Sequence, residues 1–139
     1  MPVTLTVKDL MDKNVVFINS KATVLDAVKK MLEKEVWALV VEKQGLPEGV
    51  VTERDVIRRC LANNYDLANM TVENIMSSPL VTISPDTSIR EAMSTMAEKN
   101  IRRLFVVDKG KIVGRLTQTH LFDSSLDVMT TLSSLSGQL

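Results

Sequence analysis

The run Gly49-Val50-Val51-Thr52-Glu53-Arg54-Asp55-Val56 returns 65 residues later as Gly114-Arg115-Leu116-Thr117-Gln118-Thr119-His120-Leu121. Each copy has the pattern of a short apolar strand that leads into a threonine and then into a helix. A helix that begins directly after a strand has free backbone N–H groups and a positive dipole end, which favour an anion such as phosphate. The copies differ at one polar position, where the first has Asp55 and the second has His120.

The repeat extends over most of the chain, because residues 7–57 align with residues 72–122 without a gap. The identical pairs are Val7/Val72, Met11/Met76, Val16/Val81, Ile18/Ile83, Ala27/Ala92, Met31/Met96, Glu33/Glu98, Lys34/Lys99, Leu39/Leu104, Val41/Val106, Gly45/Gly110, Gly49/Gly114 and Thr52/Thr117. Two copies are too few for a solenoid, so we expect them to pack together and bury what neither copy buries alone. The predicted fold class is α/β, with two tandem β-α-β-β-α units around a pseudo-two-fold axis.

Each copy has the same predicted element order. A short helical turn (7–11, 72–76) and a strand (15–18, 80–83) come first. Thr23 and Ser88 are each followed three residues later by an acid, which is the capping pattern that opens a helix. Two further strands follow (37–41 and 49–51, 103–107 and 112–116), with Gly45 and Gly110 in the turns, and a second helix closes each unit.

The predicted helices have apolar residues at helical spacing, which indicates one buried face for each helix. The expected inward positions are Val24, Ala27, Val28, Met31, Leu32, Ile89, Ala92, Met93, Met96 and Ala97 in the first helices, and Val56, Ile57, Cys60, Leu61, Leu121, Phe122 and Leu126 in the closing helices. The predicted boundaries are a first unit at 7–62, a polar linker at 63–71, a second unit at 72–125 and a tail at 126–139. The tail, rich in Ser and Leu, either extends the last helix toward a partner or frays.

The composition excludes several classes of function. A chain of 139 residues buries roughly 68% of its unfolded surface, and its 17 basic and 17 acidic residues give no net charge to attract nucleic acid or anionic lipid. The longest apolar run, residues 36–41, is too short to cross a bilayer. We therefore expect a cytoplasmic protein with no membrane partner. The single cysteine, Cys60, fits a small buried thiol better than a disulfide or a metal ligand.

No motif for catalysis is present in the chain. The sequence has no phosphate-binding P-loop, no Gly-x-Gly-x-x-Gly after a strand, and only one histidine, His120, so that neither a zinc pair nor a Ser/His/Asp set is expected. We therefore predict a protein that is not an enzyme and has no metal site. On spacing alone, Thr52 with Asp55 is favoured as a helix cap, which would stabilise by about 1 kcal/mol.

The duplicated pattern resembles a pair of cystathionine-β-synthase (CBS) domains, known as a Bateman module. The resemblance rests on the tandem copies, on Gly-h-x-Thr-x-x-(Asp), with h apolar, at each last strand-to-helix junction, on Ile83-Ser84-Pro85, and on residues 101–108. It covers about residues 7 to 122. It implies a regulatory fold that binds adenosine-containing ligands in two clefts, each with residues from both copies.

The resemblance assigns the first cleft position by position. Thr52 would bind a phosphate and Asp55 the ribose hydroxyls, because a carboxylate accepts both protons of a cis-diol. The second copy would place Val81, Thr82 and Ile83 around the base, and Ile101, Arg102 and Arg103 near the phosphates, which arginine binds well. We expect AMP, ADP or ATP here, although the Asp55 contact would also serve S-adenosylmethionine or NAD.

The second cleft departs from the family pattern at each polar position. It would combine Thr117 and His120 with residues of the first copy, namely Val16, Phe17, Ile18, Val36, Trp37 and Ala38. A neutral imidazole cannot accept two hydroxyl protons, and no cation is expected there for a phosphate. We expect this cleft to be empty or to hold a less charged ligand. Trp37 is expected in the core or in the cleft wall.

The leading hypothesis is a stand-alone regulatory module that senses an adenine nucleotide and acts on a homodimer or on an unidentified partner protein. One alternative is a nucleic-acid-binding protein with a patch of Arg58, Arg59, Arg102 and Arg103, which could equally be solvated surface residues. Another is a purely structural interaction module that binds no nucleotide. The zero net charge argues against the nucleic-acid alternative.

Overall fold

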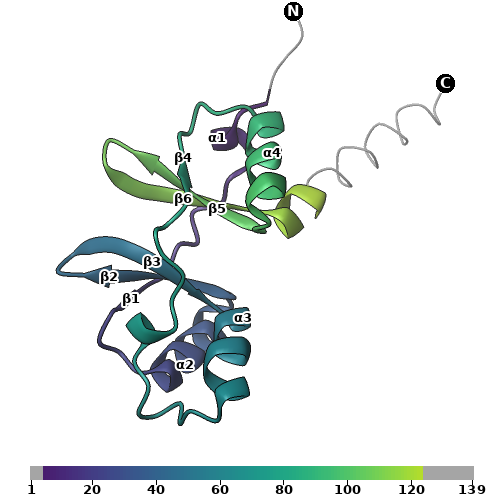
Figure 1. Ribbon diagram of the computed structural model, residues 1–139. Coiled ribbons are helices and arrows are strands. Elements are labelled where there is room, and N and C mark those ends of the chain that lie inside the picture. The colour runs from purple at the N-terminus through teal and green to yellow at the C-terminus, as the bar shows by residue number, and fades with distance from the viewer. Residues whose placement is uncertain (1–4, 124–139) are drawn as a thin grey trace, which may run out of the picture. The chain divides into compact units, whose positions relative to one another are not determined.

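The computed structural model describes residues 5–123 (Figure 1). The predicted tail at 126–139, including Leu126, lies outside the described residues. In order, the elements are α1 (Val7–Leu10), β1 (Phe17–Asn19), α2 (Val24–Lys34), β2 (Ala38–Lys43), β3 (Leu46–Thr52), α3 (Glu53–Asp55), the π-helix η1 (Val56–Cys60), the 3₁₀-helices η2 (Leu61–Asn63) and η3 (Val72–Asn74), β4 (Thr82–Ile83), α4 (Ile89–Lys99), β5 (Arg103–Asp108) and β6 (Lys111–Thr117). Residues 118–123 are helical.

The strands form two three-stranded sheets with the same topology. In each sheet the first strand pairs in parallel with the second, and the second pairs antiparallel with the third, in the orders β1-β2-β3 and β4-β5-β6. The register shifts at Val41/Glu42 in one sheet and at the equivalent Val106/Val107 in the other. The predicted α/β class and the internal repeat are therefore confirmed.

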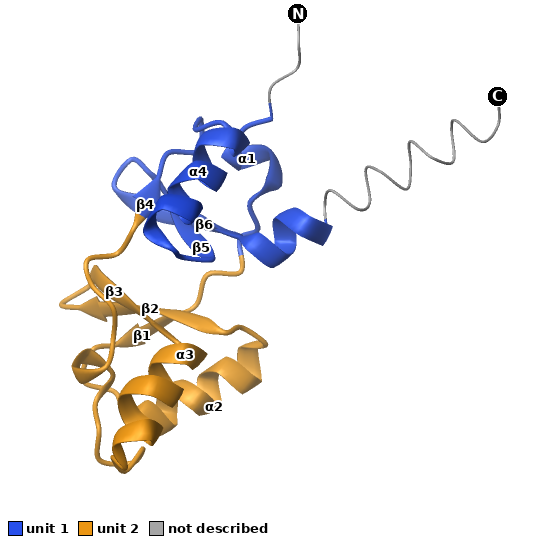
Figure 2. Cartoon of the chain, turned by 45° about the vertical axis from the view of Figure 1, so that its right-hand side comes forward, with its two compact units in different colours: residues 1–13, 82–139 blue, residues 14–81 orange. Residues whose placement is uncertain are grey.

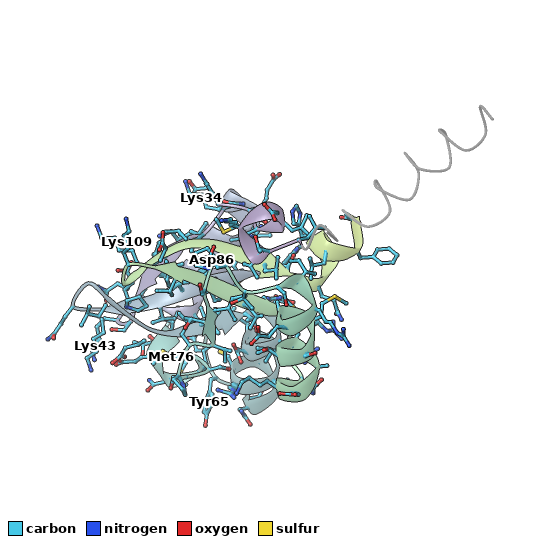
Figure 3. The ribbon with its side chains drawn as sticks, turned by 90° about the horizontal axis from the view of Figure 1, so that it is seen from above. Lys34, Lys43, Tyr65, Met76, Asp86 and Lys109 are labelled. Atoms are coloured by element: carbon cyan, nitrogen blue, oxygen red, sulfur yellow. The ribbon has the colours of Figure 1, made fainter. Side chains whose placement is uncertain are left out.

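The hairpins of the two sheets turn in the same way. The central residues have positive φ in both, at 52° and 79° for Gln44 and Gly45, and at 51° and 77° for Lys109 and Gly110. Two positive φ values in a two-residue loop are typical of a type I′ turn, whose twist matches that of paired strands. The turn residues are exposed, and Figure 3 labels Lys109 in one turn and Lys43 just before the other.

The chain forms two compact units whose boundaries differ from those of the sequence repeat (Figure 2). Unit 2 is residues 14–81, and the described part of unit 1 is residues 5–13 together with 82–123. Two segments, called here the exchanged segments, account for the difference. Residues 5–13 include the start of the first repeat but belong to unit 1, whereas residues 72–81 begin the second repeat but belong to unit 2.

Each exchanged segment pairs with the last strand of its unit's sheet. Asp12 exchanges two backbone hydrogen bonds of 3.0 and 2.8 Å with Arg115, and Ser77 exchanges two of 2.8 and 2.9 Å with Val50. Glycine is required beside both pairs because the segments approach closely. A Cβ on Gly49 would lie 2.5 Å from the Ser77 carbonyl oxygen, and one on Gly114 would lie 2.6 Å from the Met11 sulfur.

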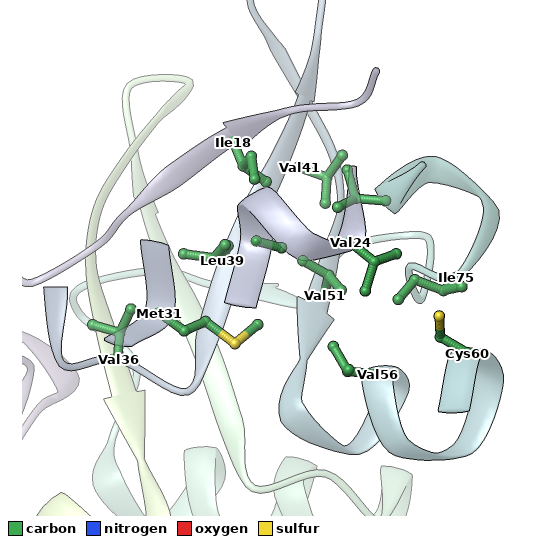
Figure 4. Packing of buried hydrophobic residues seen from close by; sticks show 12 residues of the cluster. Ile18, Val24, Met31, Val36, Leu39, Val41, Val51, Val56, Cys60 and Ile75 are labelled. Carbon is green, nitrogen blue, oxygen red and sulfur yellow. The ribbon is translucent and has the colours of Figure 1, made fainter. Parts of the chain in front are cut away.

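The core of unit 2 lies between its sheet and its helices (Figure 4). The buried side chains include Val24, Ala27 and Met31 of α2, at the predicted helical spacing. They also include Leu39, Val41 and Val51 of the sheet and, as predicted, Cys60. In α4 the equivalent buried residues are Ala92 and Met96.

Several apolar residues expected to be buried are exposed. They are Leu32, Ile57, Leu61, Met93, Ala97 and Phe122. In α2 and α4 only a narrow stripe faces the sheet, and Leu32 and Met93 lie beside it. The closing helix of unit 2 changes from α3 to the π-helix η1, which contains Ile57, and then to the 3₁₀-helix η2, which begins at Leu61. Neither has the 3.6-residue period of an α-helix, on which the prediction for these two positions depended.

Candidate functional site

Thr52 and Asp55 form a complete capping box at the start of α3. The Asp55 N–H donates to Thr52 Oγ1 at 3.2 Å. In return, Asp55 Oδ2 accepts from the Thr52 N–H at 2.9 Å and from the Thr52 hydroxyl at 3.1 Å. The helix-cap interpretation is therefore confirmed for these two residues, and the cap fixes the orientation of the carboxylate.

The other oxygen of Asp55 faces Arg59 and a residue that the sequence did not single out, Ser77. Asp55 Oδ1 accepts a hydrogen bond of 3.2 Å from the hydroxyl of Ser77, which lies in the exchanged segment of unit 2. The guanidinium Nε of Arg59 lies 3.7 Å from the same oxygen. Asp55 is only 7% exposed, and these donors offset the desolvation of its charge. Ser77 lies 22 residues from Asp55, so no local pattern could have indicated the contact.

Arg59 also holds the exchanged segment in place. Its Nη1 donates to the carbonyl oxygens of Ile75 at 3.2 Å and of Met76 at 2.9 Å. Arg58, one position earlier, is exposed. Of the two arginines predicted together as a basic pair, one is therefore committed to contacts within unit 2.

The equivalent position in unit 1 retains half of the cap. The His120 N–H donates to Thr117 Oγ1 at 3.1 Å, but no carboxylate among residues 5–123 returns a bond to Thr117. The repeat places Asp12 where unit 2 has Ser77, and Asp12 Oδ1 accepts from Nε of Arg115 at 2.8 Å. The exchanged segment of unit 1 is thus tied to a strand arginine, and that of unit 2 to the capping carboxylate.

The other residues predicted for the first cleft lie mostly in unit 1. Thr82 and Ile83 form β4 beside Phe105 and Val106 of β5. Arg103 begins β5 opposite Thr117, while Ile101 and Arg102 immediately precede that strand. Within unit 1, the two arginines therefore lie beside Thr117 of their own repeat, with the Arg102 carbonyl accepting from Gln118 N–H at 2.8 Å. Val81 is the last residue of unit 2.

Unit 2 contains the first-repeat residues assigned to the second cleft. Val16, Phe17 and Ile18 belong to the β1 region, and Val36, Trp37 and Ala38 lead into β2, where Ala38 pairs with Thr52. Trp37 is 62% exposed, so it is not a core residue.

Lys30 was missed by the sequence analysis. Its ammonium donates to the Phe17 carbonyl, which places a cation beside one of these residues within unit 2. The signal was weak because the equivalent residue in the second repeat, Thr95, is uncharged.

Residues 5–123 contain no other recognisable chemical centre. Within this range, no three His, Cys, Asp or Glu side chains are close enough together to hold a metal ion. Burial, and secondarily the charge of Asp66, raises the pKa of the Cys60 thiol, which disfavours the reactive thiolate. None of the described helices has the length and apolar character needed to cross a membrane.

Known proteins share this repeat and fold. The family model of the CBS domain matches residues 7–62 and 72–127. The chain belongs to the CBS-domain family. Its relatives include the CBS domain-containing protein YhcV of Bacillus subtilis, which is 35% identical over 109 residues, covering 78% of this chain and 77% of YhcV.

Two solved structures extend the similarity. An uncharacterized conserved protein from Pyrococcus horikoshii has a TM-score of 0.83 and 31% identity, covering 90% of this chain and 95% of that one. The hexameric CBS-CP12 protein from bloom-forming cyanobacteria has a TM-score of 0.81 and 33% identity, covering 87% of this chain and 68% of that one. CBS-domain pairs are generally regulatory modules.

Proposed function

We propose that this CBS-domain pair is a regulatory module that binds AMP, ADP or ATP, with Asp55 accepting hydrogen bonds from the ribose. The observation that carries the proposal is the Asp55 carboxylate. It is buried, its orientation is fixed by the capping box, and Arg59 Nε lies 3.7 Å from its Oδ1. A buried carboxylate with unused acceptor capacity suits a hydroxyl donor. His120, at the equivalent position, has no such group.

The remaining ligand residues are also part of the proposal. Thr52 and Arg103 would contact phosphate, Arg102 would add a second cation, and Val81, Thr82, Ile83 and Ile101 would surround the base. The residues assigned to the second cleft are proposed to bind no nucleotide or a less charged ligand. They are Val16, Phe17, Ile18, Val36, Trp37, Ala38, Thr117 and His120.

Titration calorimetry of the full chain with AMP and ATP tests the proposal. We expect binding by the wild type and a loss of roughly tenfold or more in Asp55→Ala, because a hydrogen bond to a charged group is removed. His120→Ala is the matched control and should bind as the wild type does. Absence of binding at millimolar nucleotide would contradict the proposal and favour a purely structural module. Unchanged binding by Asp55→Ala would contradict the role of Asp55 in binding the ribose.

Regulation is proposed to act through self-association. Exposed apolar side chains lie on helical elements of unit 2, namely Leu32, Ile57 and Leu61, and on α4 of unit 1, where Met93 is 55% exposed. Burying such residues against a second copy would stabilise a homodimer. Sedimentation of the wild type and of Leu32→Glu, with and without AMP, checks this: equal monomeric behaviour throughout would contradict it.

A further inference from the structure

We propose that the Ser77 hydroxyl competes with the ribose for Asp55 and so lowers the affinity of the site for ribonucleotides. This inference rests on the proposed nucleotide binding. It makes Ser77, which lies in the exchanged segment of unit 2, a residue that determines specificity between ribose and deoxyribose.

The argument begins with the acceptor capacity of the carboxylate. An ionised carboxylate has about four acceptor positions, two on each oxygen. Both positions of Oδ2 are used by Thr52, through its N–H at 2.9 Å and its hydroxyl at 3.1 Å. One position of Oδ1 is used by the Ser77 hydroxyl at 3.2 Å. Arg59 Nε, at 3.7 Å, is too distant to hydrogen-bond and leaves the last position open.

A single hydroxyl from a ligand fits this arrangement, but two do not. Because one position remains, a cis-diol that donates both protons to Asp55 must displace an existing donor. The Thr52 bonds are half of the local capping box, and losing them would leave the Thr52 N–H without its acceptor at the start of α3. Ser77 is therefore the donor that can leave.

The displacement of Ser77 requires only a rotation of its hydroxyl. Its backbone stays bound to Val50 through hydrogen bonds of 2.8 and 2.9 Å. Arg59 holds the preceding carbonyl of Met76 at 2.9 Å independently of Ser77. The cost of binding the second hydroxyl is thus one side-chain hydrogen bond, with no rearrangement of the segment.

The test is calorimetry of the full chain with AMP and with 2′-deoxy-AMP, which lacks one of the two hydroxyls. In Ser77→Ala we expect AMP to bind about fivefold more tightly, since a competing hydrogen bond is gone, and 2′-deoxy-AMP to bind as it does to the wild type. Ser77→Cys, with a weaker donor of similar size, should give a smaller gain for AMP. Ser78→Ala, at the neighbouring exposed serine, is the matched control and should change neither affinity.

The outcomes separate this inference from the proposed function. Weaker or unchanged AMP binding by both Ser77 variants would overturn the inference and leave nucleotide binding intact. An equal gain for AMP and 2′-deoxy-AMP would also overturn it, because the effect would not depend on the second hydroxyl. If the wild type binds neither nucleotide, both the proposed function and the inference fail.

Discussion

The two exchanged segments make the same backbone contacts and different side-chain contacts. Ser77 with Val50, and Asp12 with Arg115, each form a reciprocal pair of backbone hydrogen bonds beside a glycine. Their side chains then differ, since Ser77 donates to Asp55, whereas Asp12 accepts from Arg115. Backbone pairing constrains both copies of a duplicated fold equally, while a side chain at the same place is free to take a new role. Substitutions at equivalent positions of the two units can therefore distinguish residues that maintain the fold from residues that form the candidate site.

The largest expected effect is at the glycines. Gly49→Ala should lower the free energy of unfolding by about 3 kcal/mol, because its Cβ would lie 2.5 Å from the backbone oxygen of Ser77. Gly114→Ala should cost about 2 kcal/mol, because its closest neighbour is the flexible side chain of Met11 and the backbone oxygen of Asp12 lies farther away, at 2.9 Å. Urea denaturation measures both. If either variant were as stable as the wild type, the close approach of the exchanged segment at that glycine would not constrain the fold, and the two units would differ there.

The capping residues should show a smaller difference with a clear direction. Asp55→Ala should cost about 2 kcal/mol in unfolding free energy, since it removes the carboxylate that accepts from Thr52 and Ser77. His120→Ala should cost less than about 0.5 kcal/mol, because His120 contributes its backbone N–H to the cap and alanine retains that group. Thermal unfolding of the two variants side by side gives the comparison. A larger loss for His120→Ala would contradict it.

The ion pair between Arg115 and Asp12 in unit 1 is expected to contribute about 1 kcal/mol to the free energy of unfolding. Arg115→Met should lose that amount, because Arg115 and Asp12 are only 20% and 27% exposed and lie 2.8 Å apart. Lys8→Met is a control in the same segment: its ion pair with Asp86 is 3.2 Å long but 56% and 80% exposed, and should contribute almost nothing. Chemical denaturation that finds the two variants equally stable would show that the half-buried pair of Arg115 and Asp12 does not hold the segment.

The smallest expected effect is the loss of stability at low pH that two surface carboxyl groups cause. The backbone N–H of Thr6 lowers the pKa of Asp9 below its ordinary 3.8, and the Lys21 side chain lowers that of Glu73 below its ordinary 4.5. Because both pKa values are lower in the folded state, their contribution to stability is complete above the ordinary values and is lost as pH falls through the folded ones.

Asp9 lies in unit 1 and Glu73 in unit 2, so Asp9→Asn and Glu73→Gln report on the two units separately. Each variant should have a slightly lower melting temperature than the wild type at pH 7, and the difference should shrink at pH 3. A difference that grows on acidification would contradict the sign.

The repeat made most of the architecture predictable. Alternating and helical spacings depend on local sequence, and the copies support each other, so the strands around Gly49 and Gly114 and the caps at Thr23 and Ser88 follow from the chain alone. The cap at Thr52 and Asp55 was predictable for the same reason.

The contacts between distant segments could not be predicted. No periodicity indicates that residues 5–13 join the unit of residues 82–123, because a repeat boundary describes sequence and not packing. The contacts of Ser77 and Lys30 depend on tertiary packing and on side-chain length. The exposure of Ile57 and Leu61 accompanies a π-helix and a 3₁₀-helix that have no sequence signature here. The parts that were missed are those in which tertiary contacts override local preference.

The exchange of segments also has a consequence for synthesis on the ribosome. Ser77 contacts Asp55, which is synthesised 22 residues before it. Asp12 contacts Arg115, which is synthesised 103 residues after it. At roughly 5–20 residues per second, the first contact becomes available after about 1–4 seconds and the second after about 5–20 seconds. Unit 2 can therefore complete itself during translation, while the nascent segment 5–13 stays without its strand until nearly all of the described chain has been made.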